Sequence, residues 1–331
     1  NIAIGGIALD ANTTGSTLVA IGYNALGANT TGSDSVALGY DALALNTTGG
    51  ANTAVGEGAL AANTTASYNT AVGENALAAN TTGTALVALG QACLQANTTA
   101  SNNTGVGYGA LGANTTGGDN NAFGRSALAA NTTGEENCAF GNNALAANTT
   151  ADDNCAFGDD ALSVNTTGAS NVAVGDKALQ YNQTASNNTA VGKSSMAATT
   201  TGDSSAAVGK DSMLTNTTGR FNSALGYESL ALNTTGGQNT AIGKAALYNN
   251  TTASNNTAVG MNALAAVTTG EQNVAVGSGA ADAITTGIEN VLIGYNSTAS
   301  AVGAAYQIVL GSGVTCVGNS NFTFGNGTDD R

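Results

Sequence analysis

The sequence predicts an all-β solenoid in which each repeat of the sequence forms one turn of the solenoid, which we call a coil. A glycine recurs at every seventeenth position from Gly5 to Gly311, 19 times without an insertion or deletion, and such a period is typical of stacked repeats. Seventeen residues are too few for a helical hairpin but suit two short strands and two turns. The chain has no proline, which would interrupt strand pairing. We therefore expect about 18–19 coils, each about 4.8 Å from the next.

The strand predicted first in each coil ends at the repeat glycine. The residue before the glycine is Ile, Leu, Val or Phe in all 19 units, and the residue two before it is alanine in 16. Alternation of this kind places the two positions on opposite faces of a strand. We expect the large residue to face the core and the alanine to face outward, where a second copy of the chain can approach closely. We read the alanine face as a subunit contact, which packing as a parallel homotrimer would bury.

A second strand and two turns are predicted for the rest of the coil. Leu or Met stands four residues after the glycine in 16 units and is expected to be the second core position. Asn-Thr-Thr follows in 13 units, and another asparagine recurs four before the glycine, as at Asn52 and Asn137. Because identical side chains stack at the strand spacing, we expect two asparagine ladders. Charged residues fall mostly at the two positions after the glycine and the two after the Asn-Thr-Thr-Gly turn, which we expect to be solvated corners.

Two segments are predicted along the chain. Residues 1–294 form the repeat solenoid, and residues 295–331 hold degenerate repeats that act as a cap or a transition to a further module. Strand-like pieces remain at 308–311 and 322–325, where the step from one to the next is shorter than the repeat. Since Asn1 is already in register and is not preceded by a methionine, we expect the chain to be part of a longer protein.

Composition excludes several classes of function. The chain has no histidine, the commonest general base and zinc ligand. A formal net charge of −14 leaves no basic face for nucleic acid. The sequence contains no apolar run long enough to span a membrane. We predict no enzymatic activity, no catalytic, cofactor-binding or metal site, and no bound cofactor.

Several residue sets leave specific alternatives open. Cys138 and Cys155 occupy the same position in adjacent coils, where they form a disulfide or are small buried residues. The Asn-Thr-Thr asparagines are ladder residues or glycosylation sites, and outward threonines allow ice binding. Four carboxylates are a calcium site or a solvated edge: Asp152, Asp153, Asp159 and Asp160. Five tyrosines follow the repeat glycine at an outer corner and either contact a sugar or are tolerated there: Tyr23, Tyr40, Tyr108, Tyr227 and Tyr295.

The Asn-Thr-Ala-Val-Gly core at 52–56, 69–73 and 256–260 resembles the repeat motif of trimeric autotransporter adhesin heads, and the 17-residue unit is similar to repeats of bacteriophage tail fibres. The resemblance implies a trimeric β-roll that projects a receptor-binding or adhesive tip from a virion and contacts host surface glycans. Its partners would be itself and a virion tail or cell-surface anchor, and its location extracellular. The alternatives are a bacterial surface adhesin, a self-assembling extracellular filament or, less in keeping with the pattern, a monomeric ice-binding protein.

Overall fold

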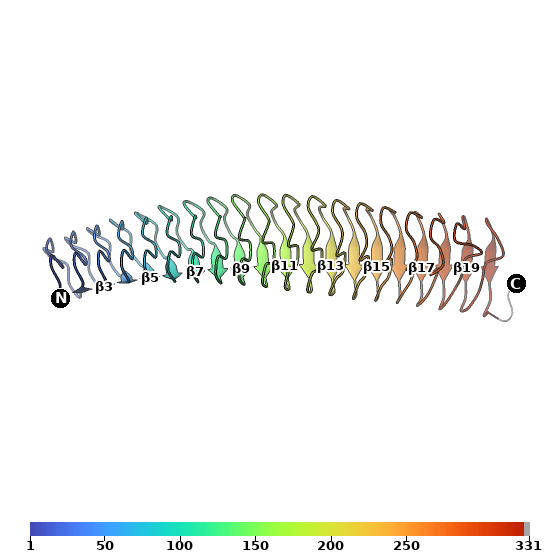
Figure 1. The fold of residues 1–331 in the computed structure, drawn as a ribbon, viewed down its shortest axis with the longest axis horizontal. Coiled ribbons are helices and arrows are strands. Elements are labelled where there is room, and N and C mark those ends of the chain that lie inside the picture. Colours follow the sequence, from blue (N-terminus) through green and yellow to red (C-terminus); the bar gives the residue numbers. More distant parts are fainter. Residues whose placement is uncertain (328–331) are drawn as a thin grey trace. The chain divides into compact units, whose positions relative to one another are not determined.

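The computed structural model describes residues 1–327, and these residues divide into two compact units. The first unit comprises Asn1–Thr167, and the second begins at Gly168. Every coil contributes one three-residue strand that ends directly before the repeat glycine, and the part of the chain described here contains no helix. Both units are parallel β-solenoids with a 17-residue repeat, which confirms the predicted fold class (Figure 1).

The first unit contains ten strands, coloured blue to green in Figure 1. Each strand pairs in parallel with the strand of the next coil, so that Ala20 lies opposite Ala37 and Val55 opposite Val72. The strands are β1 (Ile2–Ile4), β2 (Val19–Ile21), β3 (Val36–Leu38), β4 (Thr53–Val55), β5 (Thr70–Val72), β6 (Val87–Leu89), β7 (Thr104–Val106), β8 (Asn121–Phe123), β9 (Cys138–Phe140) and β10 (Cys155–Phe157).

Within residues 168–327 the second unit also contains ten strands, and it follows the same pairing rule up to β19. The register step equals the sequence repeat up to β19, where Val291 lies opposite Ile308. The step is shorter between β19 and β20, where Ile308 lies opposite Phe322. The strands are β11 (Val172–Val174), β12 (Thr189–Val191), β13 (Ala206–Val208), β14 (Ser223–Leu225), β15 (Thr240–Ile242), β16 (Thr257–Val259), β17 (Val274–Val276), β18 (Val291–Ile293), β19 (Ile308–Leu310) and β20 (Phe322–Phe324). The strand-like pieces predicted beyond residue 294 are therefore strands.

The second half of each coil is a series of turns, so the predicted second strand is wrong. The core leucine of this half has a positive φ, as at Leu26 (50°) and Leu43 (52°), which a strand does not allow. Its backbone still bonds to the next coil, because Leu26 N donates to Ala42 O at 3.0 Å and Ala28 N to Ala44 O at 3.1 Å. Complete burial of these leucines offsets the cost of a left-handed backbone.

The orientation of the strand residues is the reverse of the one predicted. The central alanine, such as Ala20 or Ala54, is fully buried, whereas the large residue before the glycine is exposed, with Leu38 at 43% and Leu225 at 51%. The reason is space, because the interior behind the strand already holds the leucine of the opposite turn. Only a methyl group fits between them, and the larger side chain therefore points outward.

Two asparagine ladders complete the interior of each unit, as predicted. In the Asn-Thr-Thr rank, Asn97 Nδ2 donates to Asn80 Oδ1 at 3.0 Å and to the carbonyl of Ala100 at 3.1 Å. In the other rank, Asn52 Oδ1 accepts from the backbone N–H of Asn69, while its Nδ2 donates to Ala66 O. The ladders thus replace the missing strand hydrogen bonds at the turns, where a backbone group would otherwise be buried without a partner.

Candidate self-association face

The outward surface of the strands is a continuous apolar feature of each unit. It consists of the first and third residues of every strand, and we call it the outer strand face. The third residues are aliphatic or aromatic throughout, and their exposed fractions include 38% for Val72, 49% for Phe157 and 39% for Ile242. The first residues are mostly Thr and Val and are half-buried or exposed. Since side chains of successive strands stand in register, the face continues from coil to coil.

No charged residue lies on the outer strand face in β1–β10 or in β11–β20. Most charged residues instead border it, at the two positions that follow the glycine and the two that precede the buried asparagine. Ten aliphatic or aromatic side chains at this exposure present several hundred Å² of apolar surface in each unit, which is at or above the largest patch of a typical monomer. A stable protein interface uses about 800 Å² per partner.

Aromatic side chains on this face stack along the first unit. The rings of Phe123 and Phe140 have centroids 4.5 Å apart, and those of Phe140 and Phe157 are 4.6 Å apart. These separations equal the strand spacing, so side chains at the same position in adjacent coils lie one above the other. Cys138 and Cys155 obey the same register on β9 and β10 and are free thiols.

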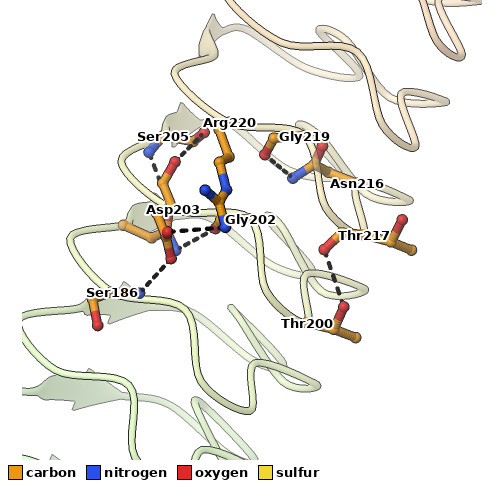
Figure 2. A network of polar contacts seen from close by, with 10 residues as sticks. Ser186, Thr200, Gly202, Asp203, Ser205, Asn216, Thr217, Gly219 and Arg220 are labelled. Atoms are coloured by element: carbon orange, nitrogen blue, oxygen red, sulfur yellow. Dashed lines mark hydrogen bonds and ion pairs between the residues drawn. The ribbon is translucent and has the colours of Figure 1, made fainter.

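The charged corners are stabilised by contacts between adjacent coils (Figure 2). Arg220 Nη2 lies 3.5 Å from Asp203 Oδ2, and Asp203 Oδ1 accepts from the backbone N–H of Ser186 at 3.1 Å. Lys193 Nζ lies 2.9 Å from Asp176 Oδ2. The side-chain hydrogen bond from Lys193 lowers the pKa of Asp176 below its ordinary value. Such exposed pairs contribute little stability, but they keep opposite charges in register.

The predicted calcium ligands do not converge on one place. Asp152 and Asp153 precede β10, whereas Asp159 and Asp160 follow it, so the strand separates the two pairs. Within residues 1–327, no group of three or more His, Cys, Asp or Glu residues is placed to hold a metal ion. A solvated edge describes these carboxylates better than a calcium site.

The Asn-Thr-Thr asparagines are fully buried except Asn12, which is half-buried, and burial removes the others as glycan acceptors in the folded chain. Asn46 has no exposed surface, and its Nδ2 donates both to Asn29 Oδ1 and to Gly49 O. The first threonine that follows donates its hydroxyl to the next coil, as from Thr47 to Thr64 O at 3.0 Å, while the second, such as Thr48, is exposed. One rank of threonines therefore faces outward, as the sequence predicts.

The tyrosines that follow the repeat glycine lie at the exposed corner predicted for them. Tyr23 and Tyr40 are 51% and 52% exposed, and their rings stack with centroids 5.4 Å apart. A shallow hollow of about 300 Å³ lies nearby on the turn side of the first unit, where Ala44, Ala61 and Ala62 form much of its lining and Asp41 is also present. Its lining offers alanine methyl groups, the Leu45 side chain, the Asn24 amide and the Asp41 carboxylate.

Residues 1–327 contain no helix that is long and apolar enough to cross a membrane. No protein-family model matches this chain, and no curated protein sequence is significantly similar to it. The fold and the outer strand face therefore carry the functional argument.

Proposed function

We propose that this chain is a structural fibre protein, a homotrimeric β-solenoid that projects a receptor-binding or adhesive tip from a virion in the manner of a phage tail fibre. The observation that carries the proposal is the outer strand face, an uncharged apolar surface that runs along every coil of each unit. A lone chain would keep this surface in water, whereas three copies can bury it around a common axis. Such a fibre acts outside the cell, attached to a virion tail or to a cell-surface anchor.

The repeated backbone supplies the mechanical part of this function. Successive coils are joined by strand and turn hydrogen bonds, and in most coils by asparagine ladders as well, with Thr199 and Val267 interrupting the Asn-Thr-Thr rank. A bacterial surface adhesin or a self-assembling extracellular filament would use the same architecture, and we retain both as alternatives.

The exposed tyrosine pair gives the proposal a recognition element. The stacked rings of Tyr23 and Tyr40 stand on an outer corner, where aromatic faces or edges can contact the apolar side of a sugar. We propose that host surface glycans bind at such corners. Loss of glycan-array binding in Tyr23→Ala and Tyr40→Ala, with retention in Tyr108→Ala, would support this part.

Mass in solution, measured by light scattering on folded protein, tests the assembly. We expect three chains per particle. The double variant Val72→Lys and Leu89→Lys places charges on the outer strand face and should reduce the mass to one chain. The control Thr82→Lys and Thr99→Lys places the same charges on the exposed threonine rank of the same coils and should leave the trimer intact.

A mass in solution other than that of three chains would contradict the homotrimer. A single-chain mass for the native protein would overturn the trimer and make the threonine rank, tested by thermal hysteresis for ice binding, the next surface to examine. Very large particles of varied length would favour the self-assembling filament.

A further inference from the structure

Cys138 and Cys155 form a pair of thiols that the proposed fibre function does not use. They are the first residues of β9 and β10, they lie directly opposite one another in the parallel register, and neither is in a disulfide. Both are half-buried on the outer strand face, where other coils carry residues such as Thr104. We propose that they form a two-thiolate binding site for one soft monovalent cation, with Cu(I) as the natural ligand class.

The separation of the two sulfurs supports a bridging cation. Strand neighbours repeat at about 4.8 Å, and the rings of Phe140 and Phe157 on the same two strands are 4.6 Å apart. A metal–thiolate bond is about 2.3 Å long, as in zinc sites, so a cation midway between two sulfurs needs them about 4.6 Å apart. The spacing of the in-register ladder therefore suits a linear sulfur–metal–sulfur bridge.

The same geometry opposes a disulfide. A disulfide needs its Cβ atoms about 3.8 Å apart, whereas the Cβ atoms of residues stacked in register point the same way and keep close to the strand spacing. Closing the bond would require β9 and β10 to approach each other against the hydrogen bonds of the rest of the coil. The pair thus remains available as thiols.

The surroundings select the type of cation. A structural zinc ion needs four ligands, and no third metal-binding side chain joins these two among residues 1–327. On the preceding strand, Asn121 occupies the same position and offers only a hard amide oxygen. Thiolates favour soft cations, and two of them satisfy a cation that accepts linear coordination. Phe140 and Phe157 lie two residues after the cysteines on the same strands, and their rings stack along the same face.

Binding must release protons, which gives the site a pH dependence. Burial and the neighbouring Cys155 raise the pKa of Cys138. Two thiols and one Cu(I) give a bis-thiolate complex and two protons, with no change in oxidation state. Since the ligands bind as thiolates, the apparent affinity should rise with pH.

Titration of the reduced chain with Cu(I), without oxygen and against a coloured Cu(I) chelator, tests the proposal. We expect one Cu(I) per chain and its loss in both Cys138→Thr and Cys155→Thr. Threonine occupies this position in other coils, so these variants keep a native repeat, and circular dichroism checks their folding. The controls Cys93→Ala and Cys316→Ala change buried thiols elsewhere and should retain one Cu(I).

Three results would overturn the proposal. One is tight Cu(I) binding that survives in Cys138→Thr. Another is a disulfide between Cys138 and Cys155 in the air-exposed folded chain, seen as a loss of two hydrogens by mass spectrometry. The last is fewer than one Cu(I) per chain that disappears when the oligomer dissociates, because both ligands of the proposed site belong to the same chain.

Discussion

The sulfur of Cys93 lies in the space that a β-carbon on Gly105 would need, because such a carbon would come within 2.5 Å of it. Most coils carry alanine at both of these positions. Here a larger residue in one coil faces a smaller residue in the next, and both are buried. The interior of the first unit is thus packed so tightly that a larger residue in one coil requires a smaller residue at the facing position of the next coil.

The pair predicts strong coupling between two substitutions. Gly105→Ala alone should destabilise the chain by about 1–3 kcal/mol through overpacking. Cys93→Ala alone should cost about 1 kcal/mol through a small cavity. The double variant restores the common alanine pair and should lie within about 0.5 kcal/mol of the native chain. Urea unfolding of the four proteins, followed by circular dichroism, measures the cycle. Simple additivity of the two single effects would contradict it.

The environment of Cys93 also predicts an inert thiol. Burial raises its pKa to about 12, and the thiolate is the reactive form. At pH 8, alkylation of Cys93 by iodoacetamide should be at least ~100-fold slower than that of the half-buried Cys155. Timed quenching and peptide mass spectrometry report each site separately. Equal rates in chain that remains folded would show that Cys93 is accessible.

The asparagine ladder predicts a large cost for removing one member. Asn97→Ala removes the donor to Asn80 Oδ1 and the acceptor for Asn114 Nδ2, which donates at 3.1 Å. Each buried polar group left without a partner costs about 1–3 kcal/mol, so we expect a loss of about 2–5 kcal/mol in urea unfolding. Thr99→Ala, on the exposed rank of the same turn, is the control and should change stability by less than about 0.5 kcal/mol. If Asn97→Ala lowers the free energy of unfolding no more than the control does, the ladder hydrogen bonds do not stabilise the fold.

We expect substitutions at two glycines of the first unit, Gly56 and Gly109, to change the stability of the chain in different ways. Gly56 has φ 131°, and an added Cβ would lie 2.6 Å from Gly73 O in the next coil. Gly56→Ala should therefore destabilise the chain by more than about 2 kcal/mol, with the neighbouring backbone displaced. Gly109 has φ 63° and open space around it, and other coils carry Asn75 or Asn143 at this position with similar φ. Gly109→Asn should be neutral or slightly stabilising. Thermal unfolding compares the two variants, and equal losses of stability would contradict the expectation that glycine is required at position 56 but not at position 109.

The coil and its register could be predicted from the sequence, because both follow from an unbroken period. The glycine spacing fixes which residues stack, and stacking is what makes Asn80 and Asn97 partners or sets Cys138 opposite Cys155. The charged corners follow for the same reason. Because the repeat is so regular, a correct prediction for one coil applies to every other coil.

The direction of each side chain could not be predicted in the same way. Alternation shows that Leu38 and Ala37 lie on opposite faces of a strand, but it does not show which face is interior. That choice depends on how much room the opposite turn leaves, and the turn was itself misassigned as a strand because a positive φ at Leu26 has no sequence signal for a leucine. The outer strand face was therefore missed, although the uncharged large residue before every glycine was visible. An apolar rank bordered on both sides by charged corners was the signal that could have found it.

Stacked like charges and paired opposite charges predict stability changes of opposite sign. Asp119, Glu136 and Asp153 occupy the same position in three successive coils, and the carboxylate of Asp153 raises the pKa of Glu136. A carboxyl whose pKa is raised on folding stabilises the fold less as pH rises through that pKa. Glu136→Gln should therefore raise the melting temperature at pH 7, and the gain should vanish at pH values below the carboxyl pKa values.

Asp176 supplies the matched case in the second unit. Its pKa is lowered by Lys193, so its contribution is present above about pH 4, the ordinary pKa of an aspartate, and is lost as pH falls through the lowered pKa. Asp176→Asn should lower the melting temperature at pH 7 and have no effect in strong acid. Both shifts should be small, because these groups are exposed, and both should shrink in 1 M salt, where the screening length falls to about 3 Å. Scanning calorimetry over pH and salt measures them, and shifts of the same sign in the two variants would mean that something other than charge stacking determines the corners.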